Sequence, residues 1–149
     1  MKKNKEQTNE FSRIILPVDG SDGAAKAVQQ ALFLAKKTGK PIVALYVVDT
    51  PRLTDVIPAD NLSVAWEDLL IKEGQKILKD VEKKASELGV AVKKKLLEGI
   101  PEEMIIKEAK KNDLIIMGCK GKSALDRIIM GSVCEKVTRH ASSPVMIVR

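Results

Sequence analysis

Three glycines and one serine near the end of the chain have a spacing that suits phosphate binding. Gly118, Gly121, Gly131 and Ser132 form the pattern G-x2-G-x9-G-S. A glycine has no Cβ, so its backbone N–H can approach a ligand closely. A helix N-terminus adds unpaired N–H donors and a partial positive charge. An apolar run ending at Met117 comes before these residues and a helix is predicted from 132 to about 140. This order of strand, glycine loop and helix start can hold a phosphate chain.

The segment between these glycines is basic. Lys120, Lys122 and Arg127 lie in it, and Asp126 is its single acid. Such a local positive field suits a triphosphate. An ordinary solvated basic loop is the alternative interpretation. The glycines also have a structural alternative, as tight turns and points of close helix–sheet packing.

Ser132 has two candidate roles. Ser132 and Glu135 form the S-x-x-E pattern of a capping box, in which the serine oxygen accepts a hydrogen bond from the Glu135 N–H. A phosphate group would compete for the same donors. The sequence leaves both roles open.

Two common nucleotide signatures are excluded. Gly121, Lys122 and Ser123 imitate the end of a Walker A loop, but Ile116 stands where that motif needs its first glycine. The first predicted strand-to-helix turn has the sequence DGSDGA, from residue 19 to residue 24, and lacks the dinucleotide pattern G-x-G-x-x-G.

The elements that position these residues alternate between strand and helix. We predict strands at 13–19, 41–48, 90–97, 113–117 and 144–148, with helices at 21–39, 63–88 and 132–140 and another starting at Pro101. Residues 49–62 show no period and are predicted to be a loop. This alternation is typical of an α/β fold with a parallel sheet and helices on both faces. The strand order 3-2-1-4-5 would bring Asp19 and Gly118 to one crevice.

Composition limits the classes of function. The 149 residues carry a net charge of +6, but the basic residues are spread out and only 3% are aromatic, which disfavours nucleic-acid binding. Residues 1–12 are expected to be a mobile tail and residues 13–149 a single domain. With no apolar run long enough to span a membrane, no secretory signal and only two cysteines, we expect a cytoplasmic protein.

Other reactive side chains give weaker signals. His140 has no metal-ligand partner at a suitable spacing, and no Ser–His–acid set is evident, so we assign no metal ligand and no catalytic residue. Asp19 suits either a ribose or base contact or a helix N-terminal acid. The pattern alone places Val47 in the core. Cys119 suits either a small structural residue or a redox-sensitive thiol.

Several short motifs together resemble the universal stress protein family, in its ATP-binding branch. They cover nearly the whole chain from Arg13 to Arg149, and comprise PVDGS (17–21), YVVD (46–49), GIPEE (99–103), IIMG (115–118), GSV (131–133) and SPVMIV (143–148). The resemblance implies an open, twisted, five-stranded parallel sheet in the order given above. It also implies a homodimer that forms through the last strand, at Val145, Met146, Ile147 and Val148.

The resemblance also implies a nucleotide site. Pro17, Asp19 and Val47 would border the adenosine, and the ribose and phosphates would be held by Gly118, Gly121, Lys122, Ser123, Gly131, Ser132 and Val133. Cys119 and Lys120 complete the set, although many relatives carry other residues at these two positions.

We therefore expect an ATP-binding stress-response module that acts as a homodimer on a protein partner the sequence does not identify. Mg²⁺ or Mn²⁺ would accompany the ATP through its phosphates. One alternative is a slow ATPase or phosphotransferase, in which Asp19 or Asp126 orients water and Lys122 or Arg127 stabilises charge. A second alternative is an interaction dimer that binds no nucleotide.

Overall fold

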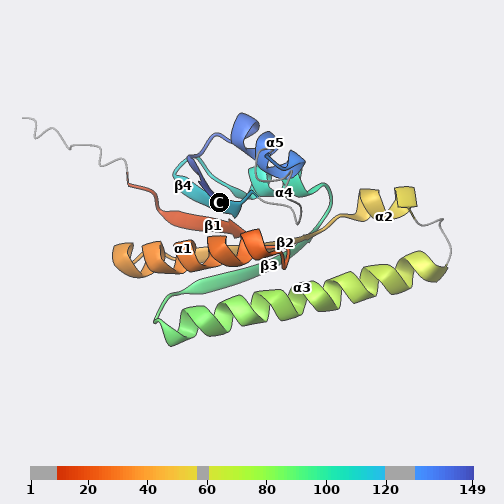
Figure 1. Cartoon of the computed structure of the whole chain (residues 1–149), viewed down its shortest axis with the longest axis horizontal. Helices are drawn as coiled ribbons and strands as arrows, with labels where there is room; N and C mark the ends of the chain where they lie inside the picture. Colours follow the sequence, from red (N-terminus) through yellow and green to blue (C-terminus); the bar gives the residue numbers. More distant parts are fainter. Residues whose placement is uncertain (1–9, 57–60, 120–129) are drawn as a thin grey trace, which may run out of the picture.

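Five parallel strands form one twisted sheet in the computed structural model, which describes residues 10–56, 61–119 and 130–149 (Figure 1). The strands lie in the order β3-β2-β1-β4-β5, which confirms the predicted order and the predicted α/β class. Their bounds are β1 Arg13–Pro17, β2 Ile42–Val48, β3 Val92–Glu98, β4 Asp113–Gly118 and β5 Val145–Val148.

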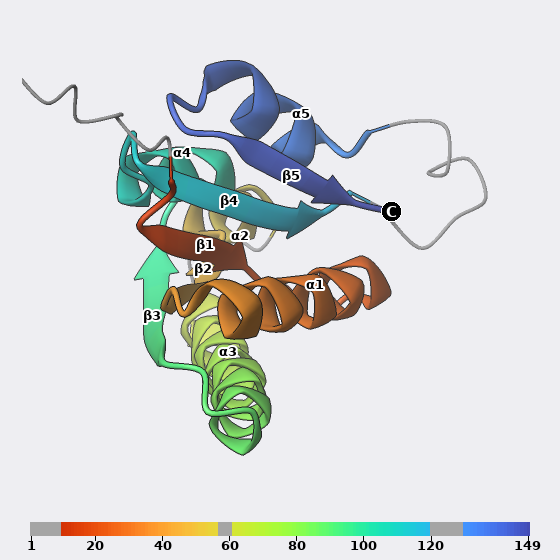
Figure 2. The same cartoon turned by 90° about the vertical axis from the view of Figure 1, so that its left-hand side faces the viewer.

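Helices cover both faces of the sheet (Figure 2). One face is covered by α1 (Asp22–Thr38) and α3 (Asn61–Glu87), and the other by α4 (Pro101–Glu108) and α5 (Ser132–His140). Successive side chains of a strand point to opposite faces. Accordingly, Ile14 and Leu16 of β1 pack in the first of two apolar clusters, and Ile15 between them packs in the second.

Helix α1 begins and ends at the predicted residues. The Ser21 Oγ accepts a hydrogen bond from the Ala24 N–H at 3.2 Å, as expected of an N-cap serine. Gly39 ends the helix in the left-handed conformation, with φ 70°. Helix α1 therefore follows from its own end signals.

The prediction of a loop over residues 49–62 is wrong. Helix α2 (Thr50–Val56) lies there, and α3 begins at Asn61, two residues before its predicted start. The Asp49 Oδ1 accepts a hydrogen bond from the Arg52 N–H at 3.2 Å, so Asp49 caps the first turn of α2. Pro51 also suits that turn, because a helix start does not need its N–H. These two residues favour the start of a short helix, although the segment has no apolar period.

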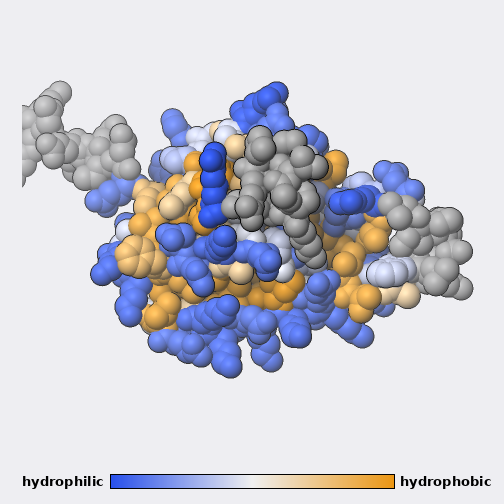
Figure 3. Space-filling model, in the orientation of Figure 1, coloured by the Kyte–Doolittle hydropathy of each residue, from blue (hydrophilic) through white to orange (hydrophobic). Residues whose placement is uncertain are grey.

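Helix α3 is longer than the strand that follows it. Its 27 residues span about 40 Å, whereas the 7 residues of β3 span about 23 Å. The N-terminal part of α3 therefore extends beyond the sheet, beside α2 (Figure 1). Hydrophilic side chains line its outer side (Figure 3). Within the described ranges, no helix is long and apolar enough to cross a membrane.

The two edge strands differ in chemistry. Strand β3 carries Lys93, Lys94 and Lys95, as predicted for an exposed edge. Lys94 pairs with Glu82 of α3 at 3.2 Å, and Lys95 pairs with Glu108. Strand β5, at the other edge, has the apolar sequence VMIV.

Candidate functional site

The carboxyl ends of β1 and β4 form the point where the winding of the sheet reverses. Strand β1 pairs with β2 on one side, with Pro17 opposite Leu45, and with β4 on the other, with Ile15 opposite Ile115. In open α/β sheets, ligands bind in the crevice at such a point. The candidate site therefore consists of the segments that follow these strands.

The turn after β1 is held by its own side chains. The exposed Asp19 accepts a hydrogen bond through Oδ1 from the Ser21 N–H at 2.9 Å. Gly20 has φ 80°, a conformation that other residues rarely adopt. Asp19 is thus fixed just beyond the carboxyl end of β1, with one oxygen engaged in the turn.

Gly118 brings the end of β4 against the first turn of α1. A Cβ placed on Gly118 would lie 2.4 Å from the carbonyl carbon and oxygen of Gly23 and 2.9 Å from the Ala24 nitrogen. No side chain fits at such a separation, so the close approach needs glycine. This contact places Gly118 beside the Asp19 turn, as the assumed strand order required.

The packing role of Gly23 was not predicted from the sequence. This glycine lies in the first turn of α1, where glycine is a poor helix former, and that unfavourable choice was the available signal for a packing role. The two glycines together set the spacing between β4 and α1.

The start of α5 corrects the expected role of Ser132. Gly131 is the N-cap, and its carbonyl accepts the Glu135 N–H at 2.9 Å. Ser132 is the first helical residue, one position too late for a capping box, and the N-cap glycine has no side chain to cap the helix. The capping alternative is therefore wrong, and Ser132 is exposed at the helix start.

The two ends of the glycine segment lie close together. A Cβ on Gly131 would lie 3.9 Å from the Cys119 carbonyl oxygen, which is an ordinary contact distance. Cys119 and Val133 are half-buried, and Gly131 is exposed. The N-terminus of α5 is thus beside the end of β4, where a bound phosphate would meet both.

Strand β2 contributes a half-buried Val47 and a buried Tyr46. The alternation of β2 places Val47 on the face of Val43 and Leu45, and Tyr46 on the opposite face, under α3. Burial raises the pKa of the Tyr46 hydroxyl, and the nearby charges of Glu73 and Asp19 raise it further. Tyr46 therefore stays neutral near the Asp19 turn.

The structure thus brings together most of the predicted site residues that it describes. Pro17, Asp19, Gly118, Cys119 and the run 131–133 lie at one end of the sheet, and Val47 lies at the end of the neighbouring strand. The other predicted site residues lie outside the described residues: Lys120, Gly121, Lys122 and Ser123, and with them Asp126 and Arg127.

A separate depression of about 370 Å³ lies at the opposite end of the strands, where β1 and β4 begin. Its charged groups bind one another and stabilise the fold. The Arg13 guanidinium and the Asp113 carboxylate form an ion pair at 2.7 Å, and Asp113 also accepts the Lys110 N–H at 2.7 Å. Across the described part of the chain, no group of three His, Cys, Asp or Glu side chains is placed to hold a metal ion.

The family model described as the universal stress protein family matches residues 10–149. This chain belongs to the universal stress protein family. A universal stress protein of Methanocaldococcus jannaschii is 41% identical over 146 residues, which cover 95% of this chain and 84% of that protein.

Solved structures of other universal stress proteins share the fold. The protein UspA from Lactobacillus plantarum superposes with a TM-score of 0.79 at 27% identity, covering 94% of this chain and 99% of that one. A universal stress protein from Archaeoglobus fulgidus, solved in complex with dAMP, superposes with a TM-score of 0.65 at 20% identity, covering 93% and 98%. At that identity the second match shows the fold alone.

Proposed function

We propose that this universal stress protein binds ATP in the crevice between β1 and β4 and acts as a nucleotide-dependent stress-response module. The observation that carries the proposal is the difference between two helix starts at one end of the sheet. The Ser21 hydroxyl caps α1, whereas the N-cap of α5 is Gly131, which has no side chain. The N–H groups at the start of α5 are therefore not bonded by their own N-cap residue and would suit a phosphate.

The surrounding residues give each part of the nucleotide a place. The close contact between Gly118 and Gly23 keeps side chains out of the base of the crevice. Gly131, Ser132 and Val133 would hold the phosphates, while Pro17, Asp19 and Val47 would border the adenosine. Lys120, Gly121, Lys122 and Ser123 would complete the phosphate contacts. Mg²⁺ or Mn²⁺ would be held through phosphate oxygens and water.

Binding would act by selecting between two relative positions of Gly118, at the end of β4, and Gly131, at the start of α5, which are the two ends of the glycine segment. A ligand shifts such an equilibrium only by its difference in affinity for the two states. ATP touches both ends of the segment in this proposal, so it would favour the arrangement in which both ends face the phosphates. A protein partner would then distinguish the loaded from the empty form.

Nucleotide release tests the binding directly. The purified protein is heat-denatured and the released small molecules are identified, and the emptied protein is titrated with ATP. Released ATP, or saturable ATP binding, supports the proposal. Released ADP together with turnover of added ATP would favour a slow ATPase or phosphotransferase. If no nucleotide is released and the emptied protein does not bind ATP, the remaining interpretation is an interaction dimer that binds no nucleotide.

Gly131→Val tests the location of the site. The substitution adds a branched side chain at the exposed start of α5, where the proposal places phosphate. We expect ATP affinity to fall at least tenfold, which is about 1.4 kcal/mol. Ser86→Val is the control, because it adds a branched residue at an exposed position of α3 near the opposite edge. Unchanged affinity in a folded Gly131→Val protein would place the phosphates elsewhere.

We also propose that two copies pair through β5. This edge strand is apolar, and Met146 is 38% exposed on it. An unpaired apolar edge favours strand pairing. Met146→Lys should convert a dimer to a monomer in sedimentation analysis. Leu69→Lys is the matched control, because Leu69 is 54% exposed on α3, which packs on β2 and β3 rather than on β5. A dimer that survives Met146→Lys at the same concentration would argue against this interface.

A further inference from the structure

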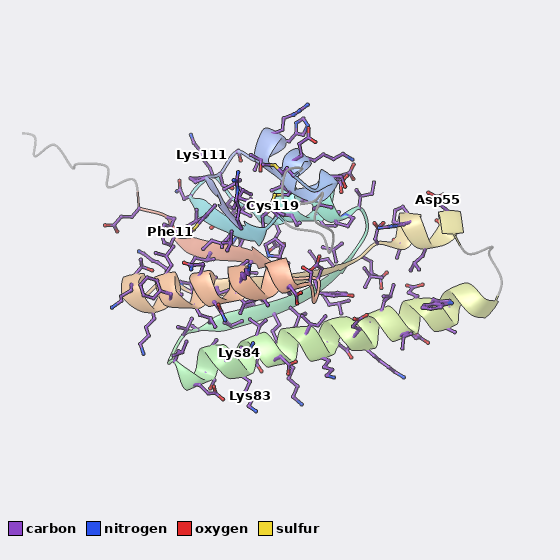
Figure 4. The ribbon with its side chains drawn as sticks, in the orientation of Figure 1. Phe11, Asp55, Lys83, Lys84, Lys111 and Cys119 are labelled. Atoms are coloured by element: carbon purple, nitrogen blue, oxygen red, sulfur yellow. The ribbon has the colours of Figure 1, made fainter. Side chains whose placement is uncertain are left out.

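We propose that Cys119 and Cys134 form a reversible disulfide within one chain when the protein meets a hydroperoxide. The two thiols belong to different elements that meet beside the candidate site. Cys119 directly follows β4, and Cys134 lies in the first turn of α5. Figure 4 labels Cys119 between the sheet and α5.

The two cysteines lie in one region of the core. The Cys119 carbonyl oxygen is 3.9 Å from the Cβ position of Gly131, which is three residues before Cys134. Cys134 is a member of the apolar cluster beneath α4 and α5, and Cys119 packs against that cluster. Both cysteines are free. A disulfide requires two sulfurs that approach to about 2.05 Å, and the packing of β4 against α5 would bring these two together.

Their environments give them different roles. Cys134 is only 3% exposed, and burial raises the pKa of its thiol to about 12, with a further contribution from Cys119. Cys134 is therefore protonated and shielded from a soluble oxidant. Cys119 is half-buried, so it meets the oxidant first. This division matches a pair with one reactive and one resolving thiol.

The chemistry balances with one hydroperoxide. The Cys119 thiol attacks hydrogen peroxide through its sulfur; an S–O bond forms, the O–O bond breaks, and the departing hydroxide takes the thiol proton and leaves as water. The Cys119 sulfur is thereby oxidised to sulfenic acid and the peroxide is reduced. The Cys134 sulfur then attacks the Cys119 sulfur. The S–S bond forms, the S–O bond breaks, and the hydroxide takes the Cys134 proton and leaves as a second water.

The bond would change the candidate site, an effect that rests on the proposed function. It would tie the end of β4 to the first turn of α5, where Gly131 lies beside Cys119. Formation of the bond would move the N–H groups of α5 relative to Gly118. We expect the oxidised protein to bind ATP about tenfold more weakly.

The test uses the full chain, reduced and then treated with hydrogen peroxide. We expect an intact mass lower by two hydrogens, a peptide pair joined through Cys119 and Cys134, and reversal by dithiothreitol. Thiols that both remain open to alkylation after treatment would overturn the proposal. So would a product that links Cys119 of two different chains.

Two variants separate the roles of the thiols. Cys134→Ser should stop at a sulfenic acid on Cys119 that dimedone traps. Cys119→Ser should leave Cys134 unoxidised until the protein is unfolded. Oxidation of Cys134 in folded Cys119→Ser would contradict the assigned order. If the reduced protein binds no ATP, the proposed function fails, while the mass measurement still decides the disulfide.

Discussion

Gly118 of β4 and Gly23 of α1 are in backbone contact, and neither a strand nor a helix alone would require that contact. A Cβ on Gly118 would lie 2.4 Å from two backbone atoms of Gly23. Backbone cannot move aside as the end of a flexible side chain can. The contact therefore makes Gly118 part of the packing between the sheet and α1 as well as of the candidate site.

Gly118→Ala should destabilise the protein by about 3 kcal/mol, at the upper end for overpacking. Gly131→Ala is the control, because its Cβ would meet an atom only at 3.9 Å. This control should cost about 1 kcal/mol or less, the loss expected of a weaker N-cap. Urea unfolding measures both. Equal stabilities for the two variants would mean that the contact between Gly118 and Gly23 relaxes freely.

Gly74→Ala should also destabilise the protein, although alanine is the better helix former by about 1 kcal/mol. The added methyl would lie 2.4 Å from Cδ1 of Tyr46, whose ring packs under α3. We expect a net loss of about 2 kcal/mol in the free energy of unfolding. The double variant Gly74→Ala/Tyr46→Leu should show a favourable coupling energy. Simple additivity of the two single changes would contradict the proposed clash.

Asp113→Asn should weaken folding in a pH-dependent way. Burial opposes the charged form of Asp113, but hydrogen bonds from Arg13 and from the Lys110 N–H outweigh it and lower its pKa. The stabilisation is therefore complete above the unfolded pKa of about 3.9 and is lost as the pH falls through the lower folded pKa.

We expect a loss of about 3 kcal/mol at pH 7, because the substitution leaves Arg13 without its partner in a nearly buried pair. The difference from wild type should shrink below about pH 4. Denaturant unfolding at several pH values measures it. Asp80→Asn, on the exposed side of α3, is the control. A difference for Asp113→Asn that stays constant down to pH 2 would contradict the ion-pair explanation.

Lys136→Met should raise the pKa of Glu102 toward its usual range. The Lys136 ammonium donates a hydrogen bond to the Glu102 carboxylate at 2.8 Å, joining α5 to α4, and this bond lowers the pKa of Glu102. An NMR titration of the glutamate side chains measures the change. Lys107→Met, an exposed change on α4 itself, should leave the Glu102 titration as it is. A Glu102 curve that is the same in all three proteins would rule out the link.

Much of the fold follows from local signals in the sequence. Ser21 and Gly39 bound α1, and Pro101 starts α4 at the predicted residue. The lysines of β3 identify an exposed edge. The strand order could not be read from the residues alone, because it depends on which crossovers bring the polar strand ends together; it was assumed and then confirmed.

The errors occurred where a short pattern competed with tertiary packing. Helix α2 has no apolar period, and only its cap at Asp49 and the early Pro51 indicated it. The sequence from Ser132 does match S-x-x-E, but Ser132 is already the first helical residue of α5. The N-cap is Gly131, which lies beside Cys119. Cys134 gave no pattern and Gly23 gave only the weak signal of a poor helix former, because their places in the fold arise from contacts between distant segments.

The lysines of β3 have a consequence for how large an assembly can become. A sheet in which both edge strands pair with other copies would add copies without limit and grow into a fibre. Here a copy that meets another through β5 presents its lysine-bearing β3 edge outward. Lysines on an exposed edge strand disfavour pairing with another strand, so in the proposed β5 dimer the two β3 edges would add no further copy.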